Sequence, residues 1–203
     1  MSQKTKGIYS ILSKPQFYSI FQMIMSGTSF RRMIVKNFIK KKNVNILDIG
    51  CGPAEILDSL PQVNYFGYDI NSEYIDYAKN KYKDRGNFYY KKFTEKELKK
   101  LPKFDYILLF GILHHLEDKE VYNLLKLAKK VLKKIGRILT EDPILMTKQN
   151  ILSKFIIKMD RGANVRSKKE YIFLIKKFFK KINSKIYHQK FIPYTWFVMN
   201  CKK

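Results

Sequence analysis

Short apolar runs alternate with longer amphipathic stretches along most of the chain. The runs have the length of β-strands and occupy residues 44–49, 63–68, 87–91, 104–110, 137–141, 185–190 and 194–200. Such runs, separated by helical patterns, are typical of strand-helix-strand units in a mostly parallel sheet. The pattern therefore predicts an α/β fold with a seven-stranded sheet, in which residues 104–110 form a central strand.

The stretches between these runs carry apolar residues at helical spacing. They predict helices at residues 54–60, from Asn71 or Ser72 through Tyr82, at 95–100 and at 117–134, the last followed by Gly136. A further helix should open at Ser167, because Glu170 stands three residues later and completes a capping box. Helices between consecutive strands are what a doubly wound α/β fold requires.

The residues before the first strand form a separate pattern. Two amphipathic stretches lie there, one after Pro15 and one after Gly27. The chain has 203 residues, with neither an internal repeat nor a low-complexity linker. We therefore expect one domain over residues 1–203, with a helical extension or lid at 1–42 and a core at 43–203.

Composition narrows the class of protein. Hydrophobic residues make up 45% and charged residues 29%, which is typical of a chain that folds. The longest apolar run, residues 106–113, is shorter than the roughly 20 residues of a membrane-spanning helix, and the N-terminus lacks a secretory pattern, so a cytoplasmic location is expected. Cys51 and Cys201 lie far apart, and His114 and His115 are adjacent, so the sequence predicts no metal site.

The net charge allows two interpretations. Lys and Arg number 41 against 17 Asp and Glu, a formal charge of +24, and only six of the 41 are arginine. A polyanionic partner such as nucleic acid would explain this charge. A coding bias toward A/T-rich codons would explain it equally, since the lysines are spread along the whole chain and Asn and Ile are also abundant.

The loop after the first strand carries the strongest chemical signal. The strand ends in Asp48-Ile49-Gly50-Cys51-Gly52-Pro53, and glycines there allow a tight turn and close approach to a ligand. Asp69 follows the second strand, where a ribose-binding acid belongs. A dinucleotide site would need a third glycine where Glu55 stands, and this carboxylate would repel a pyrophosphate. S-adenosylmethionine, which has a ribose and positive charges but no phosphate, suits these residues.

At these motifs the sequence resembles the class I S-adenosylmethionine-dependent methyltransferases. The segments that carry the resemblance are ILDIGCGP at residues 46–53, GYDIN at 67–71 and FDYILLFGILHHL at 104–116. It implies a Rossmann-like fold with helices on both faces of the sheet. It also implies that the cofactor lies against Asp48, Gly50, Cys51, Gly52, Asp69, Ile70, Phe93 and Gly111. Among these, Asp48 would lie beside the methionine end, Asp69 would hold the ribose hydroxyls and Phe93 would cover the adenine.

Two positions depart from the family pattern. Ala54 stands where many members have glycine, and Lys91-Lys92-Phe93-Thr94 replaces an acid that often accepts a hydrogen bond from the adenine amino group. The Thr94 hydroxyl or a backbone carbonyl would have to replace that acid, or cofactor affinity would be weaker. The competing interpretation is a buried strand with a tight turn, in which Asp69 only caps a helix.

Residues for the acceptor side should follow the fourth and fifth strands, because ligands of open α/β sheets bind beyond the carboxyl ends of the strands. His115, more than His114, is a candidate general base, and Asp142 a second candidate; alternatively these residues cap a helix or support the pocket. Arg161 and Arg166 are candidates to bind a carboxylate or phosphate, or else pair locally with Asp160.

The leading hypothesis is methyl transfer to an oxygen or carbon of a small molecule, lipid or saccharide intermediate. The alternatives are an RNA methyltransferase, supported by the net charge, and a non-catalytic S-adenosylmethionine-binding protein. The chain lacks the Asn/Asp-Pro-Pro-aromatic motif that often marks enzymes acting on amino groups of DNA bases. Peripheral membrane contact is a further hypothesis, carried by Arg31, Arg32, Lys36 and Lys40 near aromatic residues.

Overall fold

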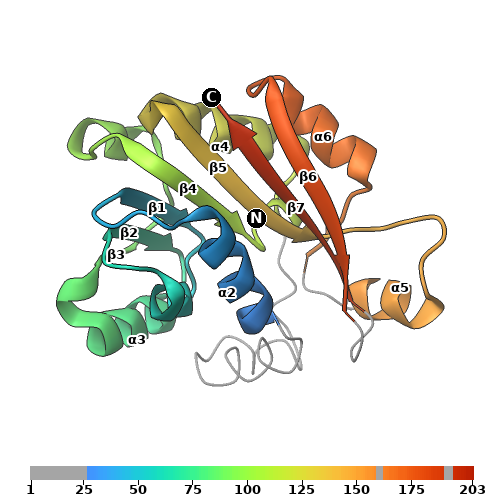
Figure 1. Cartoon of the computed structure of the whole chain (residues 1–203), viewed down its shortest axis with the longest axis horizontal. Coiled ribbons are helices and arrows are strands. Elements are labelled where there is room, and N and C mark those ends of the chain that lie inside the picture. The colour runs from blue at the N-terminus through green and yellow to red at the C-terminus, as the bar shows by residue number, and fades with distance from the viewer. Residues whose placement is uncertain (1–26, 159–161, 190–193) are drawn as a thin grey trace. The chain divides into compact units, whose positions relative to one another are not determined.

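A computed structural model describes residues 27–158, 162–189 and 194–203. The strands are β1 (Asn45–Ile49), β2 (Asn64–Asp69), β3 (Asn87–Tyr90), β4 (Phe104–Phe110), β5 (Leu132–Pro143), β6 (Lys181–His188) and β7 (Thr195–Lys202). They follow the order β3-β2-β1-β4-β5-β7-β6 in one sheet (Figure 1). The predicted seven-stranded α/β fold is therefore confirmed.

The described helices are α2 (Gly27–Phe38), α3 (Ser72–Tyr82), α4 (Asp118–Val131), α5 (Ile151–Lys158) and α6 (Lys168–Lys176). Short 3-10 helices occur at η2 (Glu55–Ser59), η3 (Lys83–Arg85), η4 (Glu95–Lys100) and η5 (Leu113–His115). The helix predicted after Gly27 is α2, whereas the one predicted after Pro15 lies outside the described residues.

The chain divides into two compact units, which meet in sequence between Phe93 and Thr94. In the first unit, β3, β2 and β1 pair in parallel. In the second unit, β4 and β5 pair in parallel, whereas β7 is antiparallel to both β5 and β6. The expectation that residues 1–203 form one domain stays a prediction.

Each unit has an apolar centre formed by its strands and the inner faces of its helices. In the first, Ile46 and Leu47 of β1 and Ile75 of α3 are completely buried. In the second, Ile107 and Leu108 of β4 are equally buried. Each such side chain stabilises the fold by about 1.5–3 kcal/mol through burial, which fixes the strand ends that carry the polar residues.

Three predicted helices differ from the prediction in form or extent, and the one at residues 95–100 is the 3-10 helix η4. The segment predicted as a helix over 54–60 is the 3-10 helix η2, because Ala54 has a left-handed backbone conformation that an α-helix excludes. The helix predicted over 117–134 ends at Val131, where the chain passes directly into β5. Gly136 is not the end of a helix: it lies within β5, where a Cβ would approach the Phe104 carbonyl oxygen to 2.9 Å.

The caps of α3 and α6 agree with the sequence prediction. The Asn71 side chain accepts a hydrogen bond from the backbone of Tyr74 at the start of α3. Ser167 and Glu170 form the predicted capping box at the start of α6. The helix α5 was not among the predicted helices, although its apolar residues follow helical spacing.

Candidate functional site

The glycine-containing loop after β1 belongs to the first unit and is fixed by backbone geometry. Gly50 and Gly52 have positive φ angles of 76° and 54°, a region that glycine adopts without steric cost. The N–H groups of Gly50 and Cys51 both donate to the Tyr68 carbonyl oxygen, at 2.8 and 3.1 Å. The loop is therefore hydrogen-bonded to the end of β2, in the tight turn that the glycines of the motif predict.

Ala54 continues this turn in a left-handed conformation, with φ at 56°. A left-handed conformation costs an L-residue with a Cβ roughly 1–2 kcal/mol. Glycine, which the resemblance implies at this position in many members, would adopt this conformation without that cost. Alanine is tolerated here, at some cost in conformational energy.

Asp69 ends β2 and binds the loop with its carboxylate. One oxygen accepts a hydrogen bond from the N–H of Gly52 at 2.8 Å, and the other accepts from the N–H of Asn71 at 2.9 Å. The carboxylate is half-buried. Since Asn71 caps α3 with its own side chain, Asp69 is not the helix cap of the competing interpretation.

Asp48 is buried at the end of β1 and is bound by a tyrosine that the sequence analysis overlooked. Its Oδ2 accepts a hydrogen bond from the Tyr65 hydroxyl at 2.6 Å. Burial raises the pKa of Asp48 to about 6, although the Tyr65 hydrogen bond opposes this rise. Asp48 pairs with Gly67 of β2, and side-chain alternation places Tyr65 on the same face of β2 as Gly67. This alternation in the sequence could have identified Tyr65 as a neighbour of Asp48.

Cys51 and Gly67 pack together beneath the loop. A Cβ on Gly67 would lie 2.9 Å from the Cys51 sulfur, so β2 needs glycine at this position. Burial raises the pKa of Cys51 well above its usual value, which keeps the side chain a neutral thiol. Cys51 therefore offers a cofactor its backbone and a small apolar surface rather than a thiolate.

The two predicted apolar contacts of the cofactor differ in exposure. The side chain of Ile70, next to Asp69, is 46% exposed, whereas Phe93 is buried. Phe93 packs edge-on against Tyr68, with their ring centres 5.4 Å apart. Lys91 and Lys92, at the positions where the family often has an acid, are both exposed.

The second unit brings together Asp142 and His114. The Asp142 Oδ1 atom lies 2.8 Å from His114 Nδ1 and 3.1 Å from the His114 backbone nitrogen. Both side chains are buried. Burial raises the pKa of Asp142, and the contact with His114 opposes the rise.

Gly111 and His115 lie in the same turn of the second unit. Gly111 has a positive φ of 68° and donates its N–H to the Glu141 carbonyl oxygen at 2.6 Å. The His115 ring lies against that of His114, with centres 4.0 Å apart. Asp142 contacts His114, whereas the sequence analysis preferred His115 as the base.

Arg166, a sequence candidate either for binding an anion or for pairing with Asp160, instead holds this turn in place. Its guanidinium donates to the carbonyl oxygens of Leu113 and Leu116, at 2.8 and 2.6 Å, and to Asp118 at 2.8 Å. A side chain that is 8% exposed, with its donors committed to the protein, cannot grip a substrate carboxylate or phosphate. Asp160 and Arg161 lie outside the described residues.

Gly162 and Asn164 complete the support of the histidine turn. The Asn164 N–H donates to the His114 carbonyl oxygen at 2.9 Å. A Cβ on Gly162 would meet the His114 ring at 2.0 Å, so the chain passes directly against the imidazole there. The segment after α5 thus positions His114, a contact between residues far apart in sequence.

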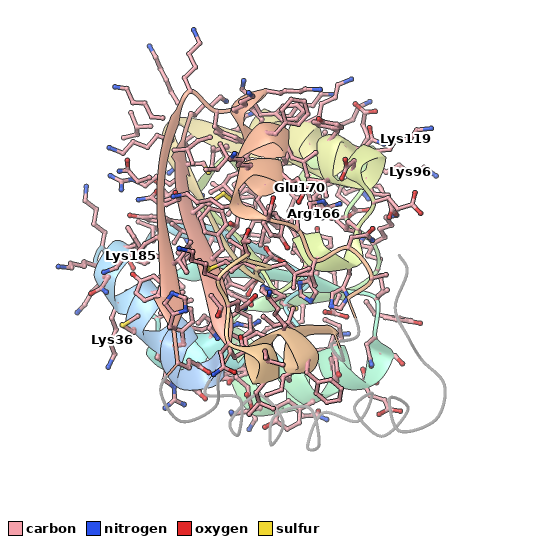
Figure 2. All side chains as sticks on the ribbon, turned by 90° about the vertical axis from the view of Figure 1, so that its right-hand side faces the viewer. Lys36, Lys96, Lys119, Arg166, Glu170 and Lys185 are labelled. Atoms are coloured by element: carbon pink, nitrogen blue, oxygen red, sulfur yellow. The ribbon has the colours of Figure 1, made fainter. Side chains whose placement is uncertain are left out.

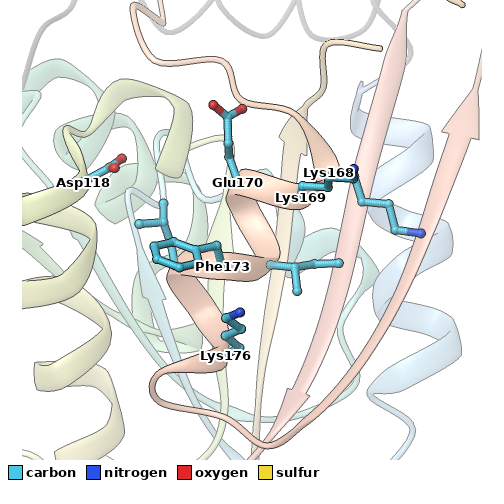
Figure 3. Close-up of a pocket in the computed structure, with 8 residues that line it drawn as sticks. Asp118, Lys168, Lys169, Glu170, Phe173 and Lys176 are labelled. Atoms are coloured by element: carbon cyan, nitrogen blue, oxygen red, sulfur yellow. The ribbon is translucent and has the colours of Figure 1, made fainter. Parts of the chain in front are cut away.

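A hollow of about 720 Å³ lies along α6 in the same unit (Figure 3). Its lining combines Phe173 with lysines of α6, and Asp118 stands at its edge. Asp118 is already paired with Arg166. The lining contains neither a glycine turn nor a strand-end acid, so the hollow lacks the features of the predicted cofactor site.

The lysines of the second unit do not all lie on one side. In the second unit, Lys96 and Lys119 lie on one side and Lys185 on the other (Figure 2). Lysines on opposite sides of a unit do not form one binding track. Among the described residues, no group of His, Cys, Asp or Glu side chains is placed to hold a metal ion. The described helices are also too short or too polar to cross a membrane.

Comparisons with known proteins place this geometry in a family. The sequence matches the family model described as a methyltransferase domain over residues 40–197. No curated protein matches the sequence. The residues that the model matches include the glycine loop, Asp69 and the histidine turn.

Solved structures share the fold at low sequence identity. An S-adenosylmethionine-dependent methyltransferase of Archaeoglobus fulgidus is 18% identical, with a TM-score of 0.69 over 92% of this chain and 100% of its own. Human N-acetylserotonin methyltransferase, in complex with S-adenosylmethionine, is 18% identical, with a TM-score of 0.69 over 98% of this chain and 60% of its own. The pyocyanin biosynthetic protein PhzM is 13% identical, with a TM-score of 0.70 over 98% and 62%. The chain thus spans about three fifths of the length of the last two.

Proposed function

The chain belongs to the class I S-adenosylmethionine-dependent methyltransferase family, and on this basis we propose that it methylates an oxygen or carbon of a small molecule, a lipid or a saccharide intermediate. The observation that carries the proposal of a cofactor-dependent methyl transfer is the fixed carboxylate of Asp69. Two backbone N–H groups hold it at the end of β2, beside a loop turned by glycines. Such an arrangement is ready to accept hydrogen bonds from ribose hydroxyls without further ordering.

The residues of the first unit fit S-adenosylmethionine by their charge. Asp48 and Asp69 supply two carboxyl groups around the loop, and Glu55 adds a third in the first turn of η2. Carboxylates favour a ligand with ammonium and sulfonium charges and disfavour a pyrophosphate. In this proposal Asp69 binds the ribose, the loop carries the methionine part, and Ile70 and Phe93 contribute apolar surface for the adenine.

In the second unit, we assign His114 the role of general base. With Asp142 ionised, the Nδ1–H of His114 donates to Oδ1, and Nε2 keeps its lone pair for a proton from the acceptor. Asp142 is then a positioning residue, since it acts through His114. His115, whose ring contacts the His114 ring at a tilt, is the second candidate for the base.

When bound, S-adenosylmethionine supplies a methyl group on a positively charged sulfur, which is open to attack by a nucleophile. The protein has to bind and orient the acceptor and remove its proton. Positioning of this kind lowers the barrier by several kcal/mol without a covalent intermediate. The acceptor is the nucleophile, so methyl transfer needs no nucleophilic residue from the protein.

RNA methylation is the competing function. Its support is the net charge of +24. The distribution of Lys96, Lys119 and Lys185 over two sides of one unit argues against a single RNA track. We expect no gel shift with bulk RNA at about 150 mM salt, where an interaction that depends on scattered charges is weakened. A shift that persists there would favour the RNA methyltransferase.

Calorimetric titration tests the proposed cofactor site. The purified protein should bind S-adenosylmethionine and S-adenosylhomocysteine, and Asp69→Ala should lose this binding. Asp58→Ala is the matched control, because Asp58 is a partly exposed acid of the same unit that pairs with Lys81 on the surface. Absence of binding by the wild-type protein at millimolar ligand would contradict the proposal. Equal loss in both variants would assign the effect to charge rather than to the site.

A further inference from the structure

Helix α5 has an inverted arrangement of apolar and polar side chains. Ile151, Leu152 and Phe155 are 85%, 54% and 59% exposed, whereas Ser153 and Ile157 on the opposite side are buried. The helical spacing places the three exposed apolar side chains on one face. A helix of a water-facing surface would show the reverse pattern, with its large apolar residues inside.

The helix is firmly attached to the rest of its unit, so its exposed face does not result from fraying. Asn150 caps it by accepting a hydrogen bond from the Leu152 backbone at 2.8 Å. Gln149 donates to Ser153 at 2.9 Å and to the Ile144 carbonyl oxygen at 3.2 Å. Ser153 also lies 3.3 Å from the Thr195 hydroxyl, at the start of β7.

The segment that carries this face has charged side chains of one sign. Residues 144–158 contain three lysines and neither Asp nor Glu. Lys148 is exposed next to the helix, and the Lys154 ammonium donates to the Thr147 carbonyl oxygen at 3.0 Å. A row of large apolar side chains flanked by lysines matches the surface of an anionic membrane, where the apolar residues enter the acyl boundary and the lysines meet lipid phosphates.

We propose that α5 docks onto an anionic lipid surface, with Ile151, Leu152 and Phe155 inserted. The helix follows the carboxyl end of β5, the same strand end that carries Asp142 (Figure 1). Membrane docking at this end gives the methyl acceptor a class: an amphiphile anchored in that surface and presenting a polar group. This step about the acceptor rests on the proposed function, whereas the docking does not.

Flotation with lipid vesicles tests the docking. The full chain would be mixed with vesicles of phosphatidylglycerol and phosphatidylcholine, and with vesicles of phosphatidylcholine alone. We expect the protein to float with the anionic vesicles. Ile151→Ser should lower the partition coefficient about tenfold, and the double variant with Phe155→Ser about a hundredfold, since each change removes one inserted side chain.

Ile135→Ser is the matched control. Ile135 is 87% exposed, close to the value for Ile151, but it lies near the beginning of β5, at the opposite end of the strand from α5. This variant should float as the wild-type protein does. Circular dichroism of each variant checks that the exposed substitutions leave the fold intact.

Three results would overturn the proposal. One is failure of the wild-type protein to float with anionic vesicles. Another is flotation that the double variant retains or that Ile135→Ser loses equally, since charge alone would then explain it. The third is a dimer in sedimentation that Ile151→Ser disrupts, without vesicle binding, because a second copy would then cover α5. None of these readouts uses methyl transfer, so they leave the proposed function to its own test.

Discussion

Asp69 and Asp142 both stand at the carboxyl end of a strand, yet their carboxylates are held in different ways. Asp69 is half-buried and uses one oxygen for each of two backbone N–H groups. Asp142 is completely buried and directs a single oxygen at both the ring and the backbone of His114. The difference indicates two tasks: an acid that can still meet a ligand from solvent, and an acid that orients another side chain.

The residues that hold the two carboxylates also lie at different sequence separations from them. Asp69 contacts a loop 17 residues away and the residue two positions on. Asp142 contacts a histidine 28 residues away, and Arg166 holds the histidine turn from 48 to 53 residues away. The first region therefore depends on local turns, and the second depends on the packing of the whole unit.

The largest effect is expected at the buried acid. Asp142→Asn can donate its amide N–H to His114 Nδ1, which moves the ring proton to Nε2 and removes the base. We expect the methyl-transfer rate to fall at least about a hundredfold. The affinity for S-adenosylmethionine should stay within about threefold. The measurement is steady-state turnover with calorimetry, once an acceptor is found.

A pH profile distinguishes positioning from general damage in this variant. A changed shape of the pH–rate profile, with an unchanged melting temperature, supports the role of Asp142 as a positioning residue. A uniform loss at every pH, together with a lower melting temperature, would speak for a structural role only.

The second effect concerns the support of the histidine turn. Arg166→Met leaves the carbonyl oxygens of Leu113 and Leu116 without their donor, and the free energy of unfolding should fall by about 3 kcal/mol. Urea denaturation measures this change. Lys168→Met, at an exposed neighbouring position, is the control and should change stability by less than about 0.5 kcal/mol. Equal effects of the two substitutions would contradict the role of Arg166.

These two regions explain how much the sequence could predict. The glycine loop, Asp69 and the Asn71 cap were predicted because their partners lie within one strand-turn-strand segment. The pairing of Asp142 with His114 and the clamp of Arg166 were not, because they depend on which loops meet after folding. Arg166 resembled a ligand-binding residue in sequence, since burial of its guanidinium cannot be read from its neighbours.

The helix after the glycine loop was also predicted only in part from the sequence. Its apolar spacing predicted an α-helix over residues 54–60, but the left-handed conformation of Ala54 starts a 3-10 helix instead. A single backbone angle, set by the turn that precedes it, overrides the local pattern. Helix α5 was not predicted either, although its apolar residues follow helical spacing, and its outward-facing residues could not be foreseen from the sequence.

The third effect tests Asp48, the buried carboxyl of the first region. A folded-state pKa raised from 3.8 to about 6 means that the buried carboxyl favours folding when protonated, and that this contribution is lost as the pH rises through about 6. Asp48→Asn removes the ionisation. The difference in free energy of unfolding, variant minus wild type, should therefore be larger at pH 8 than at pH 4, by about 3 kcal/mol at most.

The same variant, although relatively more stable at high pH, should bind the cofactor more weakly there. Asp48→Asn should weaken the binding of S-adenosylmethionine about tenfold at pH 8, because a carboxylate near a cationic ligand is lost. Urea titrations at both pH values and calorimetry at pH 8 provide the two measurements. A stability difference that does not change with pH would show that Asp48 does not titrate as a buried acid.

The smallest effect concerns Ala54. Ala54→Gly relieves the left-handed conformation and should raise the free energy of unfolding by up to about 1 kcal/mol. Ala78→Gly, at an equally buried position inside α3, should lower it by about 1 kcal/mol. Thermal melting of the two variants compares them directly, and destabilisation by both would refute the account of the turn.

The most direct test of the division between the two aspartates is calorimetric titration of Asp69→Asn and Asp142→Asn with S-adenosylhomocysteine. Both substitutions remove one negative charge and keep the shape of the side chain. The account predicts that Asp69→Asn weakens binding at least about a hundredfold, whereas Asp142→Asn binds within about threefold of wild type. Equal losses in both variants, or wild-type affinity in Asp69→Asn, would contradict it.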